Sequence, residues 1–208
     1  MKKKFTALAL SFGVYVSIYA QKVDYFVIHK GESVGLVDSN GVEIVATKYE
    51  SIGKFDIQKK GWAKITQNGL IGFITKEGKE VLTPVFKEVK PFGTYKKDWA
   101  LVSRNGKLGF INNSGALVVD AVYDEIDQFN KVRKGWAKVK LDGKYGFINT
   151  SGAIVVPTKY DKIENFNVYK KDLAIVMLDN KFGLINMEGK ETLAPIYDNL
   201  QPLDNKKK

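Results

Sequence analysis

The sequence repeats itself with a fixed period of 37 residues. Two glycines recur at this spacing, five times each, and the second lies six residues after the first. The first series is Gly35, Gly72, Gly109, Gly146 and Gly183, and the second is Gly41, Gly78, Gly115, Gly152 and Gly189. A period of about 20–50 residues is typical of one supersecondary unit that is copied and stacked on its neighbours. The chain is therefore expected to fold as an array of five similar units.

Each repeat contains the signature of a two-residue β-hairpin. Two apolar-rich runs, which begin at Trp136 and at Lys144, flank the dipeptide Asp142-Gly143. This dipeptide tolerates positive φ at both positions and suits a type I′ turn. The same place in other repeats holds Asn68-Gly69, Asn105-Gly106 and Asp179-Asn180. The repeats are therefore expected to be all-β.

The turn fixes which residues face one another across the hairpin. With Asn68-Gly69 as the loop, Ile65 is expected opposite Gly72, and Ala63 opposite Ile74, on a small apolar face. The other face holds bulkier and partly polar side chains, namely Trp62, Lys64, Thr66, Ile71 and Phe73. Because neither face is fully polar, each hairpin is expected to lie between neighbouring repeats. The glycine on the small face is expected to let the adjacent repeat approach closely.

The residues after the hairpin predict a further strand and then a third apolar segment. The β-branched run 153–156 ends at Pro157, which predicts an edge strand or a strand that stops there. Other repeats hold Pro84 and Pro195 at this place. Tyr160, Ile163 and Phe166 follow at a spacing of three, which fits neither a regular strand nor an α-helix. We expect these side chains in the core, on a bulged short strand or a turn of 3₁₀-helix.

Two ladders of large side chains share the period. One comprises Tyr49, Phe86, Tyr123, Tyr160 and Tyr197, and the other comprises Tyr25, Trp62, Trp99, Trp136 and Leu173. Equally spaced Trp rings would suit stacking on a polysaccharide chain. However, the Trp residues are expected to share their face with Phe73, Phe110 and Phe147, and aromatic side chains in such apolar company usually belong to a core. The Trp ladder is therefore interpreted as structural.

The N-terminal segment differs from the repeats. The basic residues 2–4 and the apolar run 5–16 predict a signal peptide over residues 1–20, with cleavage near Ala20. The remaining domain, residues 25–208, divides into repeats 25–61, 62–98, 99–135, 136–172 and 173–208. No later apolar stretch is long enough to span a membrane. We expect export to the periplasm, the cell surface or the medium, with no membrane span after cleavage.

Composition excludes most catalytic and cofactor chemistry. The chain has no Cys and one histidine, His29, so it lacks a thiol nucleophile, a disulfide framework and a His pair for a metal. Carboxyl groups such as Asp124, Glu125 and Asp161 follow the repeat, whereas a catalytic pair needs two different environments. We therefore expect no enzyme, no cofactor and no metal site. A glycan hydrolase that uses asymmetric loop carboxylates is a distant alternative.

The net charge of +10 is concentrated at the ends of the chain. Three positive charges lie in residues 1–20 and three more in residues 206–208, which leaves a mild excess of +4 on the repeats. A basic arm that binds nucleic acid would need longer runs of charge. No nucleic-acid partner is therefore expected.

A polar loop in each repeat carries two adjacent basic residues at constant register. The pairs are Lys59-Lys60, Lys96-Lys97, Arg133-Lys134 and Lys170-Lys171. Stacking would bring these pairs onto one edge of the array, where eight positive charges can attract an anionic partner. The neighbouring acids Asp56, Asp98 and Asp172 would weaken this stripe, and Lys-rich loops also block edge-to-edge association. The eight basic residues are the candidate binding residues.

The combined pattern resembles the bacterial WG β-repeat family. The pattern is G-K-[apolar]-G-[FL]-I-[NT]-x-x-G, then β-branched residues, a proline and Tyr-Asp-x-Ile-x-x-Phe, and residues 143–166 match it best. The Trp of the family's Trp-Gly dipeptide is replaced here, as in Val34-Gly35, while Trp stands at the start of the hairpin. The resemblance covers all five repeats. It implies an all-β array in exported or surface proteins and supplies no catalytic residues.

Two architectures and several functions are compatible with these observations. An open superhelical array is favoured because the chain starts and ends on whole units, and a five-bladed β-propeller-like ring is the alternative. The expected function is a non-catalytic extracytoplasmic binding or scaffold module that acts by protein–protein interaction. The alternative is binding of an anionic glycan or envelope polymer through the basic loops. A protein partner predicts an exposed apolar patch on a terminal repeat, whereas a polyanion predicts affinity that falls steeply with salt.

Overall fold

All regular structure in the described part of the chain is β-strand. The computed structural model describes residues 24–201 and residue 203, so the predicted signal peptide lies outside the described residues. Nineteen strands form five antiparallel sheets. The first sheet contains β1 (Tyr25–Lys30), β2 (Ser33–Asp38) and β3 (Glu43–Tyr49). The second sheet contains β4 (Ser51–Phe55), β5 (Trp62–Gln67), β6 (Leu70–Thr75) and β7 (Glu80–Phe86).

The remaining three sheets repeat the four-stranded order of the second. The third sheet contains β8 (Glu88–Val89), β9 (Trp99–Arg104), β10 (Lys107–Asn112) and β11 (Leu117–Tyr123). The fourth sheet contains β12 (Glu125–Ile126), β13 (Trp136–Leu141), β14 (Lys144–Asn149) and β15 (Ile154–Tyr160). The fifth sheet contains β16 (Lys162–Ile163), β17 (Leu173–Leu178), β18 (Lys181–Asn186) and β19 (Glu191–Tyr197).

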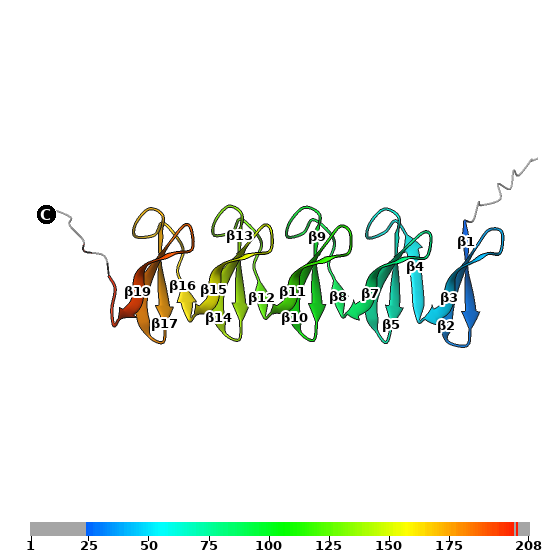
Figure 1. Ribbon diagram of the computed structural model, residues 1–208, viewed down its shortest axis with the longest axis horizontal. Helices are drawn as coiled ribbons and strands as arrows, with labels where there is room; N and C mark the ends of the chain where they lie inside the picture. The colour runs from blue at the N-terminus through cyan, green and yellow to red at the C-terminus, as the bar shows by residue number, and fades with distance from the viewer. Residues whose placement is uncertain (1–23, 202, 204–208) are drawn as a thin grey trace, which may run out of the picture.

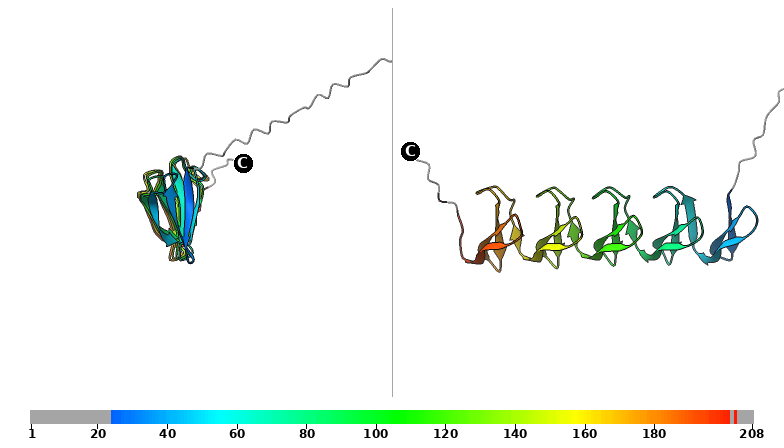
Figure 2. Two further views of the ribbon diagram at one scale, coloured as in Figure 1. Left: turned by 90° about the vertical axis from the view of Figure 1, so that its right-hand side faces the viewer. Right: turned by 45° about the horizontal axis from the view of Figure 1, so that its top comes forward.

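The five sheets form an open row. Figure 1 shows them side by side, with the first and the last sheet at opposite ends. Viewed along the row, the units nearly overlay one another (Figure 2), so the rotation from one unit to the next is small. No described strand of the first sheet pairs with a strand of the fifth. The expected open array is confirmed, and the described residues do not close into a propeller-like ring.

The hairpin turns adopt the expected backbone. Asn68 and Gly69 have φ values of 52° and 67°, and Asp142 and Gly143 have φ values of 49° and 81°. Positive φ at both central positions is the mark of a type I′ turn. The predicted register is also confirmed, because Ile65 pairs with Gly72 and Ala63 with Ile74.

The chain passes from one sheet to the next through a single residue. Glu50 separates β3, the last strand of the first sheet, from β4, the first strand of the second. In the same way Asp124 separates β11 from β12, and its backbone N–H donates a 2.8 Å hydrogen bond to Lys140 O in the fourth sheet. Each sheet from the second onward therefore takes its first strand from residues that follow the last strand of the preceding sheet.

The proline in the third strand of the hairpin unit does not end that strand. Pro157 lies inside β15, which continues to Tyr160, so the expectation that the strand stops at proline is wrong. The edge position that was the other expectation is correct, because β15 pairs only with β14 in the described sheet. The pairing shifts register between Tyr145 and Phe147, which leaves a bulge where the missing N–H of proline costs no ladder bond.

The two glycine series have different roles from those expected. A Cβ on Gly72 would lie 2.4 Å from Leu82 O, which belongs to β7 of the same sheet. The expectation that this series admits the adjacent repeat is therefore wrong. The second series does so: a Cβ on Gly115 would lie 2.1 Å from Val81 O of the preceding sheet.

The core lies between the sheets. Ala63, Ile65 and Ile74, on the small face of the second sheet, are completely buried against the first sheet. Trp62 and Phe73, on the bulky face, pack against three apolar residues of the third sheet, namely Ala100, Val102 and Ile111. The expected position of each hairpin between its neighbours is confirmed.

The apolar segment at a spacing of three belongs to two different sheets. Tyr160 ends β15 in the fourth sheet, and Ile163 lies in the two-residue strand β16 of the fifth. Tyr160, Ile163 and Phe166 are all buried in one cluster between these sheets. The expected core position is confirmed, and the short strand is formed rather than a 3₁₀-helix.

The second glycine series allows a matched test of packing between sheets. Gly115 (φ +86°) and Gly41 (φ +81°) occupy the same turn, but a Cβ on Gly41 would meet nothing within 4 Å. We expect Gly41→Ala to lower the free energy of unfolding by about 1 kcal/mol through backbone strain. Gly115→Ala is expected to cost about 3 kcal/mol or more, because the preceding strand must also move. Chemical denaturation of dilute protein measures both, and equal losses would contradict the close contact.

Candidate functional site

The dibasic loops lie along one long edge of the array. Each loop leads from the first strand of a sheet into its hairpin, and Figure 1 shows these loops repeating on the edge opposite the hairpin turns. The backbone of the loop is fixed by hydrogen bonds. Trp62 N–H donates to Lys59 O at 3.0 Å, and Gly61 N–H donates to Asp56 Oδ1 at 2.5 Å. These bonds therefore hold the loop backbone in place around the basic pair.

The first basic residue of three pairs covers a Trp ring. Lys59 Nζ lies 4.2 Å from the ring centre of Trp62, and Lys96 Nζ lies 3.8 Å from that of Trp99. The Arg133 guanidinium carbon lies 4.3 Å from the ring centre of Trp136. These are cation–π contacts, in which the positive charge is attracted to the face of the ring. The fourth pair differs, because Leu173 replaces the Trp and Lys170 is exposed.

The Trp rings themselves have no free face for a ligand. Trp62, Trp99 and Trp136 are only 5–6% exposed. Each stacks edge-on against a Phe of the segment that follows, as Trp99 does with Phe129 at 5.9 Å between ring centres. A sugar could reach these rings only by displacing both the core and the cation above it.

The second basic residue of each pair is directed to solvent. Lys60, Lys97, Lys134 and Lys171 are all exposed. Of the acids beside them, Asp56 forms a 3.2 Å ion pair with Lys76. Asp98 and Asp172 occupy, with φ of 64°, the turn position that Gly61 has in the second sheet. The exposed basic stripe therefore consists of five of the eight candidate residues, namely these four and Lys170.

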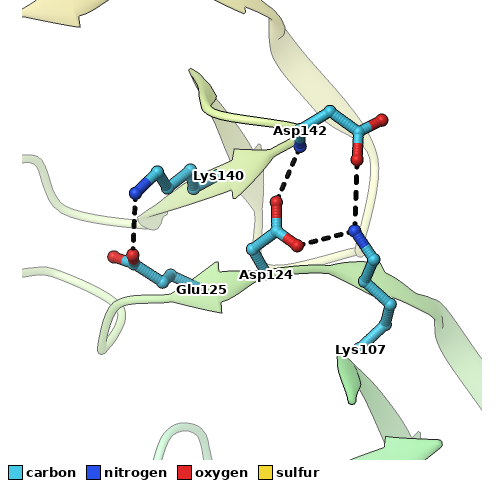
Figure 3. Close-up of polar contacts among 5 residues, drawn as sticks. All are labelled: Lys107, Asp124, Glu125, Lys140 and Asp142. Atoms are coloured by element: carbon cyan, nitrogen blue, oxygen red, sulfur yellow. Dashed lines mark hydrogen bonds and ion pairs between the residues drawn. The ribbon is translucent and has the colours of Figure 1, made fainter. Parts of the chain in front are cut away.

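Charged residues fasten consecutive sheets at the opposite edge. The Asp124 carboxylate accepts hydrogen bonds from Lys107 Nζ at 2.6 Å and from the Asp142 backbone N–H at 2.7 Å (Figure 3). Lys107 also lies 3.2 Å from the Asp142 carboxylate, and Lys140 pairs with Glu125 at 3.0 Å. Lys107 belongs to the third sheet and Asp142 to the fourth, so this cluster ties the two sheets together.

The same cluster recurs one repeat later. Asp161 accepts hydrogen bonds from Lys144 Nζ at 2.6 Å and from Asp179 N–H at 2.7 Å. The hydrogen bond from lysine lowers the pKa of Asp124 and of Asp161 below the usual value. A general acid for glycan hydrolysis needs a carboxyl group with a raised pKa, so these groups suit structural links. Within residues 24–201, no group of three or more His, Cys, Asp or Glu is placed to hold a metal ion.

The two ends of the array expose apolar side chains. At the N-terminal end Phe26 is 53% exposed, and at the C-terminal end Tyr197 is 45% and Leu203 is 86% exposed. A pocket of 260 Å³ opens in the last unit. It is lined by Tyr169, Lys170, Leu173, Ala174, Ile175, Leu184, Leu200 and Gln201. Sheet faces that are buried at every internal junction are thus open at the ends.

For a protein partner the sequence predicts an apolar patch on a terminal repeat, but the candidate residues drawn from it are those that obey the repeat. The signal was in the departures from it. Phe26 stands where the other four repeats have an alanine: Ala63, Ala100, Ala137 and Ala174. Leu173 stands at the Trp position, and Leu184 stands where three repeats have Phe. The part of the chain that the structure describes contains no helix able to cross a membrane.

The carboxylate clusters make stability depend on acid. Because the folded-state pKa of Asp124 and Asp161 is lowered, their contribution is complete above the unfolded-state pKa of about 4. It is lost as the pH falls through the lower folded-state value. We expect Asp124→Asn plus Asp161→Asn to flatten the loss of stability below about pH 4. Urea denaturation across pH 2–7 measures this, with the exposed Asp120→Asn as control. A slope unchanged from that of the parent chain would contradict the role of the clusters.

Several solved structures share weak similarity with the chain, and no curated protein matches its sequence. A eukaryotic initiation factor matches at 10% identity and TM-score 0.34, over 83% of this chain and 52% of its own. PorZ of Porphyromonas gingivalis, described as a bacterial surface component of the type-IX secretion system, matches at 14% and 0.29, over 84% and 26%. AztD of Citrobacter koseri matches at 12% and 0.29, over 87% and 58%. The chain thus spans about a quarter to three fifths of these proteins, and the likeness does not extend to a function.

The sequence model described as "WG containing repeat" matches the chain five times in succession. The matches cover residues 35–70, 71–107, 109–145, 145–182 and 182–207. They include the hairpin of every sheet after the first and the strand that links each sheet to the next. The family and the all-β array are both compatible with a non-catalytic binding module. Since these matches cover nearly all of the repeats, the chain belongs to the WG containing repeat family.

Proposed function

We propose that this protein is a non-catalytic scaffold module that acts outside the cytoplasm and binds another protein through its end faces. The observation that carries the proposal is the exposure of apolar residues at both ends of the array. Phe26 at one end, and Tyr197 and Leu203 at the other, are 45–86% exposed, whereas Ala63, Tyr160 and Phe166 at the same positions of other repeats are buried. Exposed apolar patches of this kind are typical of protein interaction sites.

Export supports the same proposal. The basic residues 2–4, the apolar run 5–16 and the small residue Ala20 form the pattern of a signal peptide. A chain without Cys depends on its packed core for stability, and the sheets are buried against one another along the whole row. Such a row holds its two ends at a fixed separation, which is what a scaffold between partners requires.

A second candidate function is binding of an anionic glycan or envelope polymer along the loop edge. The observation that favours it is the repeated exposure of Lys60, Lys97, Lys134 and Lys171 on one edge. Regularly spaced positive charges on a straight array match an extended chain of negative charges. We do not propose hydrolysis of such a polymer, because its acid would have to differ from the lysine-bound carboxylates that recur in this chain.

Photo-crosslinking in the exporting cells tests the protein-binding function. A benzophenone amino acid is placed at Phe26 or Tyr197, at the two ends, or at Thr83, which is exposed on β7 of the second sheet. We expect protein adducts of defined mass from Phe26 and Tyr197 and none from Thr83, at low and at high salt alike. Adducts that are absent from both ends, or equally frequent at Thr83, would refute the function.

Salt-dependent binding to a sulfated polysaccharide, with a neutral polysaccharide as reference, tests the second candidate. Lys60→Glu, Lys97→Glu and Lys134→Glu together are expected to weaken binding at low salt by about tenfold or more. These substitutions leave the cations that cover the Trp rings in place. The matched control is Lys54→Glu, Lys64→Glu and Lys87→Glu, which makes the same change in charge at other exposed positions. Equal losses for the two triple variants would show that no specific stripe exists.

A further inference from the structure

We propose that copies of this chain join head to tail, with the C-terminal segment of one copy completing the first sheet of the next. The inference rests on the proposed function, since it names a second copy as the protein that the end faces bind. The contact between two copies would then be a junction of the same kind as those that join consecutive sheets within the chain.

In the described part of the chain, the first sheet has no counterpart of the first strand of the other four sheets. Sheets two to five each begin with a strand that pairs with the outer edge of the hairpin, namely β4, β8, β12 and β16. The first sheet has the order β1-β2-β3, so no described strand pairs with the outer edge of β1. By the repeat, such a strand would fall within residues 14–18, which belong to the predicted signal peptide. Its removal would leave the edge of β1 ready to accept a strand.

The C-terminal segment has the sequence of that missing strand. One repeat after the linking segment of the fifth sheet, Tyr197, Asp198, Leu200 and Leu203 match the following residues: Tyr160, Asp161, Ile163 and Phe166. Ile163 and Phe166 are buried between sheets, whereas Leu203 is 86% exposed. The segment therefore carries the apolar pattern of a linking strand but has no following sheet in the described chain to bury it.

The backbone partners of this strand follow from the internal junctions. Asp161 N–H donates to Met177 O at 2.8 Å, and Glu164 N–H donates to Ile175 O at 2.9 Å. The equivalent bonds between copies join Asp198 N–H to His29 O and Gln201 N–H to Val27 O. The carboxylate of Asp198 already contacts Lys181, as Asp161 contacts Lys144. Its second oxygen would accept from the N–H of Gly31 in the next copy, as Asp161 accepts from Asp179.

A tyrosine–glutamate hydrogen bond supplies independent specificity. Tyr49 OH donates to Glu80 at 2.5 Å across the first junction, and Tyr160 OH donates to Glu191 at 2.5 Å across the fourth. At the second junction Phe86 lacks the hydroxyl, and the partner position is Leu117. The residues that would meet between copies are Tyr197 and Glu43, which restore the hydrogen-bonding combination. Tyr197 is 45% exposed and Glu43 is exposed, so both are available.

The shapes of the two ends are complementary as well. At three of the four internal junctions a large Trp and Phe on one sheet face a small Ala on the next, as Trp136 and Phe147 face Ala174. At the C-terminal end the large residues are reduced to Leu173 and Leu184, which line the 260 Å³ pocket. At the N-terminal end the small residue is enlarged to Phe26, which is exposed on the same face as Ile28. A larger knob at one end thus meets a larger hole at the other.

The row geometry decides what such contacts build. The two faces lie at opposite ends of a nearly straight array with little rotation between units (Figures 1 and 2). A contact between two different faces that repeats without closing into a ring produces an open fibre. The turn at Gly41, which has open space where Gly115 meets a preceding sheet, would then be filled by the last sheet of another copy.

Disulfide trapping tests the register directly, because the chain contains no Cys of its own. The chain is expressed with its natural N-terminus in an exporting host. Asn199→Cys and His29→Cys are placed in separate chains, at the positions that match the internal pair Lys162 and Met177. After mixing and mild oxidation we expect covalent dimers, and a chain with both substitutions is expected to give a ladder of multimers. Asn199→Cys mixed with a chain carrying Cys at exposed Asn113 is the control.

Sedimentation velocity over a range of protein concentrations measures the association itself. We expect the parent chain to form species that lengthen with concentration, and Phe26→Ala to weaken association about tenfold or more. Phe26 is half exposed, so its loss leaves the fold intact. Tyr197→Phe and Glu43→Gln are each expected to weaken association. The double variant is expected to be little weaker than either single variant, because both remove the same hydrogen bond. Tyr123→Phe, whose partner position is Ile154, is the control and should leave association unchanged.

The possible outcomes separate this inference from the proposed function. A chain that stays monomeric at every concentration and forms no mixed disulfide would overturn head-to-tail joining. If photo-crosslinks at Tyr197 then trapped a different protein, the scaffold function would stand with another partner. Association that survives Phe26→Ala and gives disulfides equally with the Asn113 control would also overturn the inference, because it would show contact through other surfaces.

Discussion

The structure depends on the burial of one sheet face against the opposite face of the next sheet. A three- or four-stranded sheet of this size has no interior of its own, so its apolar side chains lose contact with water only when another sheet covers them. The small face, with Ala63 and Ile65, is completely buried in this way, and Trp62 and Phe73 on the bulky face are nearly so. Each sheet therefore stabilises two neighbours, and the two terminal faces are the places where this requirement is unmet.

The path of the chain reinforces the stacking. Because one residue separates the last strand of a sheet from the first strand of the next, a sheet that forms all four strands is held directly beside its predecessor. The linking residue then serves a second purpose. Asp124 binds a lysine of the sheet that it leaves and a backbone N–H of the sheet that it enters. Backbone pairing, charge and apolar burial thus act at the same junction, which favours cooperative folding along the row.

The stacking of the sheets also determines which surfaces remain exposed. Along the loop edge, three cations cover Trp rings, and the second residue of each basic pair, together with Lys170, faces solvent. Along the other edge, Lys107 and Lys144 form ion pairs with acids of the following sheet. The ends differ because their side chains are apolar and lie on faces that are elsewhere buried. The array therefore has polar edges, on which part of the charge is paired, and two ends with exposed apolar side chains.

The sequence by itself determined the period, the all-β class, the type I′ turns and the register of each hairpin. These features depend on local properties of the chain. The backbone preference of Asn68-Gly69 sets the turn, and the side chains from Ala63 to Ile74 alternate between the two faces of the hairpin. The tertiary structure decided which neighbour each glycine admits, that β15 runs through Pro157, and that the first strand of a sheet follows directly from the last strand of its predecessor. It also decided that Lys59 and Lys96 cover rings while Lys60 and Lys97 stay free. These outcomes depend on contacts between residues far apart in the chain, and a periodic sequence repeats the same letters whether a face is covered or open.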